Sequence, residues 1–182
     1  STAAANGGNN PFGNDSCGYS DANSDNVSDL ASFSSHGPCS DGRQKPDLVA
    51  PGSHITGGVV QADSATNGNG SAHPGFKASS ICALNGGGTP GSTNNFFPLG
   101  QQFYTVSSGT SHATPAVAGA CALVRQFFIN RYLMIPSPAI TKAFLMNSTR
   151  YLTGSRANDN LWSPGQGMGG LNLGTAFDGV AR

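Results

Sequence analysis

A serine stands at the point where an apolar helix is predicted to begin. Residues 107–124 read SSGTSHATPAVAGACALV, and no Asp, Glu, Lys or Arg follows Ser111 until Arg125. The first N–H groups of a helix lack intrahelical acceptors and the helix dipole is positive there, so this position can bind developing negative charge, as an oxyanion hole does. Pro115 cannot donate to the carbonyl of Ser111 and leaves the first turn open. These residues alone allow two interpretations, Ser111 as a nucleophile or Ser111 as an ordinary helix cap.

The helix that would position this serine is predicted from its apolar spacing. Between Ser111 and about Asn130, apolar residues fall at positions 117, 120, 121, 124 and 128, and also at 116, 123 and 127. They cover nearly the whole circumference, and a helix that is apolar all round is buried. We therefore predict a central, buried helix over 111–130.

The other predicted elements are short. Residues 48–50 read as a buried strand between two prolines, and residues 30–35 as an extended piece. Ser137 and Pro138 are a good cap and first turn for a second helix that ends near Asn147, and a short terminal helix is expected from about Leu173. Residues 1–29 form a polar loop region, and residues 61–101 a long loop or insertion.

The composition fits one secreted domain and excludes several partners. The chain has 182 residues, enough for one domain with a real core. Its net charge is zero, without a basic stripe or an acidic tail, which argues against nucleic acid and anionic membrane as partners. No apolar run approaches the ~18 residues needed to span a bilayer. The low charge and the loops rich in Asn, Ser and Gly fit a secreted or extracellular protein.

The cysteines and acidic residues show no metal-binding pattern. The four cysteines, Cys17, Cys39, Cys82 and Cys121, match no zinc-site spacing. In a secreted protein Cys17 and Cys39 are a plausible disulfide pair, whereas Cys121 lies inside the apolar run and is expected to be a buried free thiol. No metal ligand is assigned, and calcium sites in residues 1–30 are left open because no motif demands them.

Three segments resemble the subtilisin-like serine proteases, the subtilases of the peptidase S8 family. GTSHATPAVAG (109–119) is similar to the nucleophile motif of that family at every fixed position. FSSHGPCSDGRQKPDLVAPG (33–52) resembles a second signature at the expected place upstream, and GQGMGGLNLGTAF (165–177) resembles the closing segment before the last helix. The residues of the second segment look most like those of the larger subtilases that carry extra domains. The resemblance covers roughly residues 25–60 and 103–182.

The resemblance implies a fold and a set of site residues. Ser111 would be the nucleophile, with its own N–H as one oxyanion donor. Gly109 and Thr110 would support the oxyanion hole, and Ser107 and Ser108 would line the edge of the cleft where substrate backbone lies. The implied fold is a three-layer α/β domain with a parallel sheet and flanking helices, of which residues 1–182 supply only the C-terminal part.

The rest of the family's catalytic machinery has no match in these residues. The Asp-[Ser/Thr]-Gly and His-Gly-Thr motifs that carry its aspartate and histidine do not occur. AAANGGN (3–9) resembles the segment that carries the side-chain oxyanion donor, but the preceding glycine is missing, so Asn6 is not assigned that role. The four histidines, His36, His54, His73 and His112, have no aspartate at a spacing that suggests an orienting partner. They are interpreted as solvated or structural.

The sequence therefore predicts the C-terminal part of a secreted serine endopeptidase, with peptide or protein substrates. Without a general base the isolated chain is expected to be inactive, and its partner would be the missing N-terminal part of the catalytic domain. An alternative is a non-catalytic secreted binding or scaffold module that keeps subtilase architecture. A cut parallel sheet would also expose strand edges and apolar surface, so the fragment could self-associate.

Overall fold

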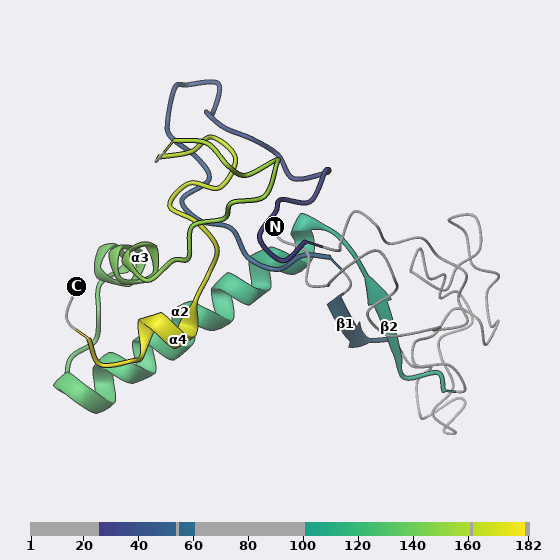
Figure 1. Ribbon diagram of the computed structural model, residues 1–182. Helices are drawn as coiled ribbons and strands as arrows, with labels where there is room; N and C mark the ends of the chain where they lie inside the picture. The colour runs from purple at the N-terminus through teal and green to yellow at the C-terminus, as the bar shows by residue number, and fades with distance from the viewer. Residues whose placement is uncertain (1–25, 54, 61–100, 161, 181–182) are drawn as a thin grey trace. The chain divides into compact units, whose positions relative to one another are not determined.

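The chain divides into two compact units in the computed structural model. The structure describes residues 26–53, 55–60, 101–160 and 162–180 (Figure 1). Among the described residues, one unit contains 26–52 and the part of the chain from 109 onward, and the other contains the described part of 53–108. The first unit holds the helices α2, α3 and α4 of the described residues and is the one that carries Ser111.

The predicted long helix is present as α2 (Thr110–Tyr132), but its burial differs from the prediction. Its buried residues are Ala120, Val124 and Phe128, a single stripe at i, i+4 spacing. Leu123 is 46% exposed and Ile129 is 38% exposed. Within the described residues the helix is therefore covered on one side only, and the expectation of burial around its circumference is not met. Apolar composition identified the helix, but the extent of burial depends on what packs against it.

The two later helices begin with the caps expected from the sequence. In α3 (Pro138–Asn147) the Ser137 hydroxyl accepts a hydrogen bond from the Ile140 N–H at 3.2 Å. In α4 (Leu173–Ala176) the side-chain oxygen of Asn172 accepts from the Thr175 N–H at 3.1 Å. Each cap satisfies one of the backbone donors that the first turn of a helix leaves free. The predicted second helix and terminal helix are thus confirmed.

An aromatic cluster holds α2, α3 and the end of α4 together. The ring of Phe127 lies 5.8 Å from Phe144 and 5.3 Å from Phe177, measured between ring centroids. Phe128 meets Phe144 edge-on at 5.3 Å, and Tyr132 also packs against Phe128 at 5.3 Å. Pairs of this kind add about 0.5–1.5 kcal/mol beyond the burial of their area. The cluster extends the buried core formed by Ala120, Val124, Phe128 and Leu145.

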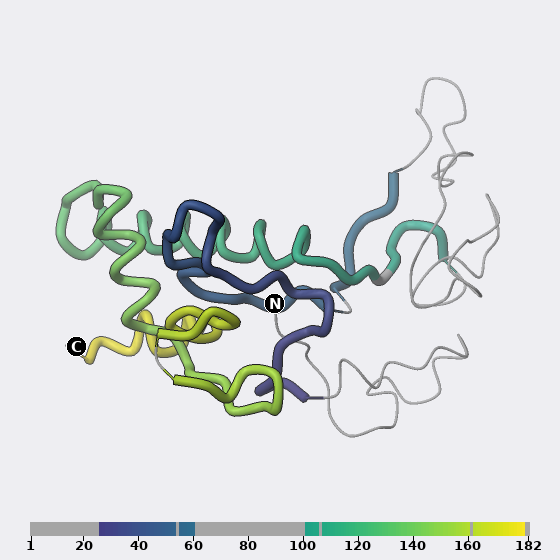
Figure 2. The backbone as a smooth tube through the Cα atoms, turned by 90° about the horizontal axis from the view of Figure 1, so that it is seen from above, coloured from purple at the N-terminus to yellow at the C-terminus, as the bar shows by residue number. Residues whose placement is uncertain are grey.

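The predicted strand at 48–50 is reduced to one parallel bridge. Val49 pairs with Gly170: the Val49 N–H donates to the Gly169 carbonyl at 3.0 Å, and the Leu171 N–H donates to the Val49 carbonyl at 2.7 Å. Val49 and Ala50 are buried, as expected. Residues 30–35 are not fully extended, because the Ser34 N–H donates to the Ala31 carbonyl and closes a turn. Figure 2 shows the segment before residue 52 running beside the loop that follows α3.

That loop is organised by a buried glutamine. The Gln166 side chain accepts from the Leu152 N–H at 2.8 Å and donates to the carbonyls of Leu152 and Ala157 at 2.9 and 2.6 Å. Its own N–H donates to the Ser163 hydroxyl at 3.0 Å. A buried amide stabilises a structure only when its groups are paired, and this one is. Gly167, next to it, has φ of 62°, and a Cβ there would lie 2.3 Å from the carbonyl oxygen of Pro46.

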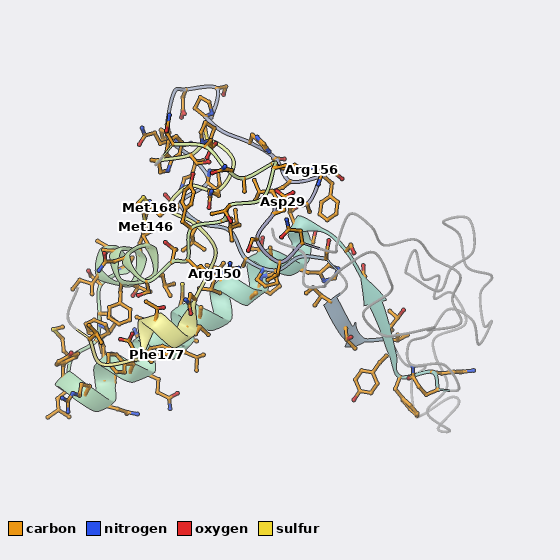
Figure 3. The ribbon with its side chains drawn as sticks, viewed as in Figure 1. Asp29, Met146, Arg150, Arg156, Met168 and Phe177 are labelled. Carbon is orange, nitrogen blue, oxygen red and sulfur yellow. The ribbon has the colours of Figure 1, made fainter. Side chains whose placement is uncertain are left out.

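A buried carboxylate joins the start of the described chain to the same loop. Asp29 is 6% exposed, and one of its oxygens accepts from the N–H groups of Leu30 and Arg156 at 2.9 and 2.8 Å. The Arg156 guanidinium lies 3.5 Å from the other oxygen (Figure 3). Gly154 packs directly against this aspartate, and a Cβ at Gly154 would lie 2.3 Å from the Cβ of Asp29.

A second carboxylate links the segment before Val49 to α3. Asp47 accepts from Lys142 of α3 at 2.7 Å and also from Lys45. Partial burial alone would raise the pKa of Asp47, but the hydrogen bonds and charges of Lys142 and Lys45 outweigh it, so the pKa lies below its ordinary value of 3.8. The ionised form is therefore the one that the fold stabilises.

The second unit contains a short antiparallel sheet that the sequence did not predict. Strand β1 (Ile55–Gly58) pairs with β2 (Tyr104–Ser107), with Ile55 opposite Ser107 and Gly58 opposite Tyr104. The pairing continues one step further, because the Val59 N–H donates to the Phe103 carbonyl at 2.8 Å. The two strands enclose most of the 61–101 segment, which lies outside the described residues apart from Gln101. The described sheet is thus small and antiparallel.

The contact between Gly154 and Asp29 can be tested by substitution. Gly154→Ala should lower the free energy of unfolding by about 1–3 kcal/mol, because the added methyl overlaps a buried side chain. Gly119→Ala in α2 is the matched control, since a Cβ there meets nothing within 4 Å. This control should raise stability by about 0.5–1 kcal/mol through helix propensity. Urea unfolding of both variants measures the difference, and equal effects would contradict the contact.

The Asp47–Lys142 pair predicts a specific pH dependence. Lys142→Met should lower the free energy of unfolding at neutral pH by about 0.5–1 kcal/mol, a small value because Lys142 is half exposed. A carboxyl with a lowered folded pKa contributes stability above its unfolded pKa and loses it as pH falls through the folded pKa. The difference between wild type and variant should therefore shrink below pH 3.8. Urea unfolding from pH 7 to pH 2.5 measures it, and Lys142→Met in an Asp47→Asn background should have little effect.

Candidate active site

Ser111 lies on the first turn of α2 with its hydroxyl exposed. Gly109 is the residue before the helix, and α2 begins at Thr110. The Ser111 hydroxyl and the Ser111 N–H make no hydrogen bond with any other group in the part of the chain that the structure describes. An open hydroxyl beside an unpaired helix N–H is the arrangement that acyl transfer needs, a nucleophile next to a donor for the oxyanion.

Pro115 shapes this first turn, and a neighbouring threonine compensates. Pro115 lies inside α2 and has no N–H to donate to the Ser111 carbonyl. One position earlier, the Thr114 hydroxyl donates to the Thr110 carbonyl at 3.1 Å. The turn that carries Ser111 is thus held by a side chain as well as by backbone. Sequence reasoning identified Pro115 but missed Thr114, whose i, i+4 spacing from Thr110 was the available signal.

The turn is anchored to the Ala50-Pro51-Gly52 segment by one backbone hydrogen bond. The Gly109 N–H donates to the Gly52 carbonyl at 2.7 Å, and the His112 N–H donates back to the Gly109 carbonyl at 3.0 Å. Gly109 has φ of 165° and ψ of 155°, an extended backbone that any residue adopts. A Cβ at Gly109 would meet its nearest neighbours at 3.7 Å or more. Within the described residues, space for a side chain therefore exists at Gly109.

A hollow of about 690 Å³ runs beside this turn, within the same unit. One wall is the face of α2 that begins at Thr110 and continues through Ala113, Thr114, Val117, Ala118 and Cys121. The opposite wall is the segment 45–50, together with Ser34 and Ser35. Part of the surface of α2 that is not buried faces this hollow. Residues 45–50, which belong to the second signature-like segment, therefore lie beside α2.

The structure brings together only part of the predicted site. Gly109, Thr110 and Ser111 form one continuous turn, as expected. Ser108 and Ser107 belong to the second unit, where Ser107 is the last residue of β2. The predictions that Ser107 and Ser108 line a cleft edge therefore stay predictions.

The described histidines do not act as partners of Ser111. The His112 ring lies back over Gly109, with its Cδ2 atom 3.8 Å from the position of a Cβ there. His36 lies beside the loop at Gly165, 3.5 Å from the position of a Cβ at that residue. Neither imidazole hydrogen-bonds the Ser111 hydroxyl in the regions that the structure covers. His54, His73 and Asn6 lie outside the described residues.

The cysteines and candidate metal ligands add no catalytic group here. Cys39 and Cys121 are free thiols, both half-buried. Cys121 is a free thiol as predicted, but it is half-buried and not buried. Cys17, the partner proposed for Cys39, lies outside the described residues. Across the described ranges, no group of three or more His, Cys, Asp or Glu residues could hold a metal ion. Calcium was left open in residues 1–30, of which residues 1–25 lie outside the described ranges. No helix among the described residues is long and apolar enough to cross a membrane.

Similar proteins connect this site to serine proteases. Two Dictyostelium discoideum proteins, serine protease/ABC transporter B family proteins tagB and tagD, are each 31% identical over 140 residues. These matches cover 71% of this chain and 6% of each relative. A third, tagA, is 30% identical over 152 residues, 78% of this chain and 7% of the relative. The chain thus spans a small fraction of the length of these relatives.

A family model matches almost the whole chain. The model of the subtilase family, Peptidase S8, covers residues 7–169. This range includes the Ser111 turn and the second signature, and it also includes 61–101, where the motifs alone showed no match. The chain therefore belongs to the subtilase family of serine peptidases.

Proposed function

We propose that Ser111 is the nucleophile of a secreted serine endopeptidase. The observation that carries the proposal is the first turn of α2, where an exposed serine hydroxyl lies beside its own unpaired N–H in a subtilase chain. The name shared by the three relatives, serine protease, supports the same reaction. The low charge of the chain supports a location outside the cell.

The proposed reaction passes through an acyl-enzyme. The Ser111 oxygen attacks a peptide carbonyl, and a general base accepts the serine proton. The carbonyl oxygen becomes an oxyanion next to the Ser111 N–H, with Thr110 and Gly109 shaping the turn that holds this donor. The amine leaves with a proton, and water then releases the acid and regenerates the serine. The parent protein would have a three-layer α/β catalytic domain.

The general base and its orienting carboxylate are proposed to come from outside these 182 residues. The chain contains neither family motif for them. A serine without a base is a poor nucleophile at neutral pH, and in subtilisin the loss of serine or histidine costs roughly 10⁶-fold in turnover. We therefore expect the isolated chain to be nearly inactive. The relatives, whose printed name joins protease to ABC transporter, support a parent with further domains.

The second candidate is a non-catalytic secreted binding or scaffold module. It is favoured because no histidine imidazole hydrogen-bonds the Ser111 hydroxyl within the described residues. It is disfavoured by the open serine at a helix start, because a scaffold has no need of a reactive group there. Translated sequence adjoining this chain decides between them. If that sequence lacks both the Asp-[Ser/Thr]-Gly and the His-Gly-Thr motif, the protease interpretation of the parent fails.

Labelling with a fluorophosphonate serine probe tests the nucleophile. The isolated chain should label no faster than Ser111→Ala, because no base activates the serine. Adding a polypeptide that carries the two missing motifs should produce labelling that Ser111→Ala abolishes and that the exposed control Ser40→Ala retains. Mass spectrometry locates the probe. Prompt labelling of Ser111 in the isolated chain would overturn the expected inactivity, and Ser111-independent labelling after complementation would overturn its role.

The exposed apolar surface of α2 predicts self-association of the isolated chain. Leu123 and Ile129 are exposed on the helix, and Leu133 and Ile135 follow it at 91% and 62% exposure. Apolar surface of this kind favours association unless a partner covers it. Light scattering coupled to size exclusion should give a mass above that of the monomer, rising with concentration. A monomer at high concentration would contradict this expectation.

A further inference from the structure

A potential acceptor for an N-linked glycan ends helix α3. Asn147-Ser148-Thr149 has a hydroxyl residue two positions after asparagine and no proline between them, the acceptor pattern for N-glycosylation. Among the described asparagines, only Asn147 and Asn26, in Asn26-Val27-Ser28, have this pattern. The two sites offer a comparison within one chain.

The side-chain amide of Asn147 is available for modification. Asn147 is exposed, and its side chain makes no hydrogen bond with the described part of the chain. Asn172 shows the contrast, because its amide nitrogen donates to the Thr175 hydroxyl at 2.7 Å while its oxygen caps α4. The amide of Asn147 therefore has no structural task that a glycan would disturb.

Asn147 also lines a hollow with aromatic walls. This hollow has a volume of about 290 Å³, near the lower end of small-molecule pockets at ~300 Å³. Its aromatic lining is Phe127, Phe144 and Tyr132, and the Tyr132 side chain is 57% exposed. The C–H face of a sugar ring packs well against aromatic rings, which present apolar area.

We propose that Asn147 carries an N-linked glycan whose first N-acetylhexosamine packs against the aromatic wall of this hollow. The inference rests on the secreted location in the proposed function. In the transfer step, the Asn147 amide nitrogen attacks C1 of a polyprenyl diphosphate-linked oligosaccharide. The N–C1 bond forms, the C1–O bond breaks, the diphosphate leaves with the electron pair, and the amide proton passes to a base of the transferase.

Asn26 is the matched control because its surroundings differ. Its side-chain oxygen accepts from the Ser28 N–H at 2.9 Å, and the Ser28 hydroxyl accepts from Arg150 at 3.0 Å. Asn26 lines neither of the two hollows described above. Within the described residues, a glycan at Asn26 would therefore lack the aromatic wall that lines the hollow at Asn147.

Translation of the full chain into endoplasmic-reticulum microsomes tests the modification without requiring a folded product. With a signal peptide added, Asn147→Gln should run with one glycan fewer than wild type, and Thr149→Ser should keep that glycan. Endoglycosidase treatment should bring all three to the same mobility. If Asn147→Gln loses no glycan, the proposal fails. Probe labelling of Ser111 reports on the protease chemistry separately, so the two failures are distinguishable.

The melting temperature of the secreted chain tests the packing of the first sugar. Wild type trimmed to a single sugar should melt about 2–4 °C above Asn147→Gln, the shift that ~1 kcal/mol produces in a domain of this size. The same comparison with Asn26→Gln should show less than about 1 °C. Equal shifts at the two sites, or no shift at Asn147, would overturn the packing of the sugar against the hollow.

Discussion

The first unit depends on the parallel pairing of Val49 with Gly170. This pairing fixes the segment 47–52 against the loop that follows α3. From that segment, Asp47 reaches Lys142 on α3, and the Gly52 carbonyl receives the Gly109 N–H just before α2. The turn that presents Ser111 is thus positioned by residues about sixty positions earlier in the chain. Three backbone hydrogen bonds and one ion pair make these connections.

Residues next to each helix were enough to predict the helices. Contacts between residues far apart in the sequence could not be predicted. The caps at Ser137 and Asn172 act on neighbouring residues, so their side chains were sufficient to predict α3 and α4. The Asp29–Arg156 contact joins residues 127 positions apart, and nothing near Asp29 indicates its partner. Strands β1 and β2 were missed because ITGG lacks apolar alternation and its partner lies beyond a long loop.

The sequence predicted which residues form the candidate site, but only part of their arrangement in space. Motif resemblance identified Ser111, and the structure places it on the first turn of α2 with an open hydroxyl. Burial of α2 was overestimated because the apolar pattern reports what the helix can bury, not what covers it within these residues. The spacing of Thr114 from Thr110 was a signal available in the sequence, whereas the hydrogen bond from the Gly109 N–H to the Gly52 carbonyl joins two backbone groups that a sequence motif does not display.

The crowding at Gly167 has a genetic consequence. The atoms that a Cβ there would meet are the backbone carbonyls of Pro46 and Asp47, at 2.3 and 2.5 Å. Substituting Pro46 or Asp47 changes a side chain but leaves its main-chain carbonyl in place. A substitution of either residue therefore cannot relieve the overlap that a side chain at Gly167 would cause. At Gly154 the obstructing atoms are the Cβ and Cγ of Asp29, at 2.3 and 2.4 Å, and its main-chain Cα, at 2.6 Å. A change at residue 29 can therefore relieve a defect at Gly154 only in part, because Asp29→Ala removes the Cγ but keeps the Cβ and the Cα.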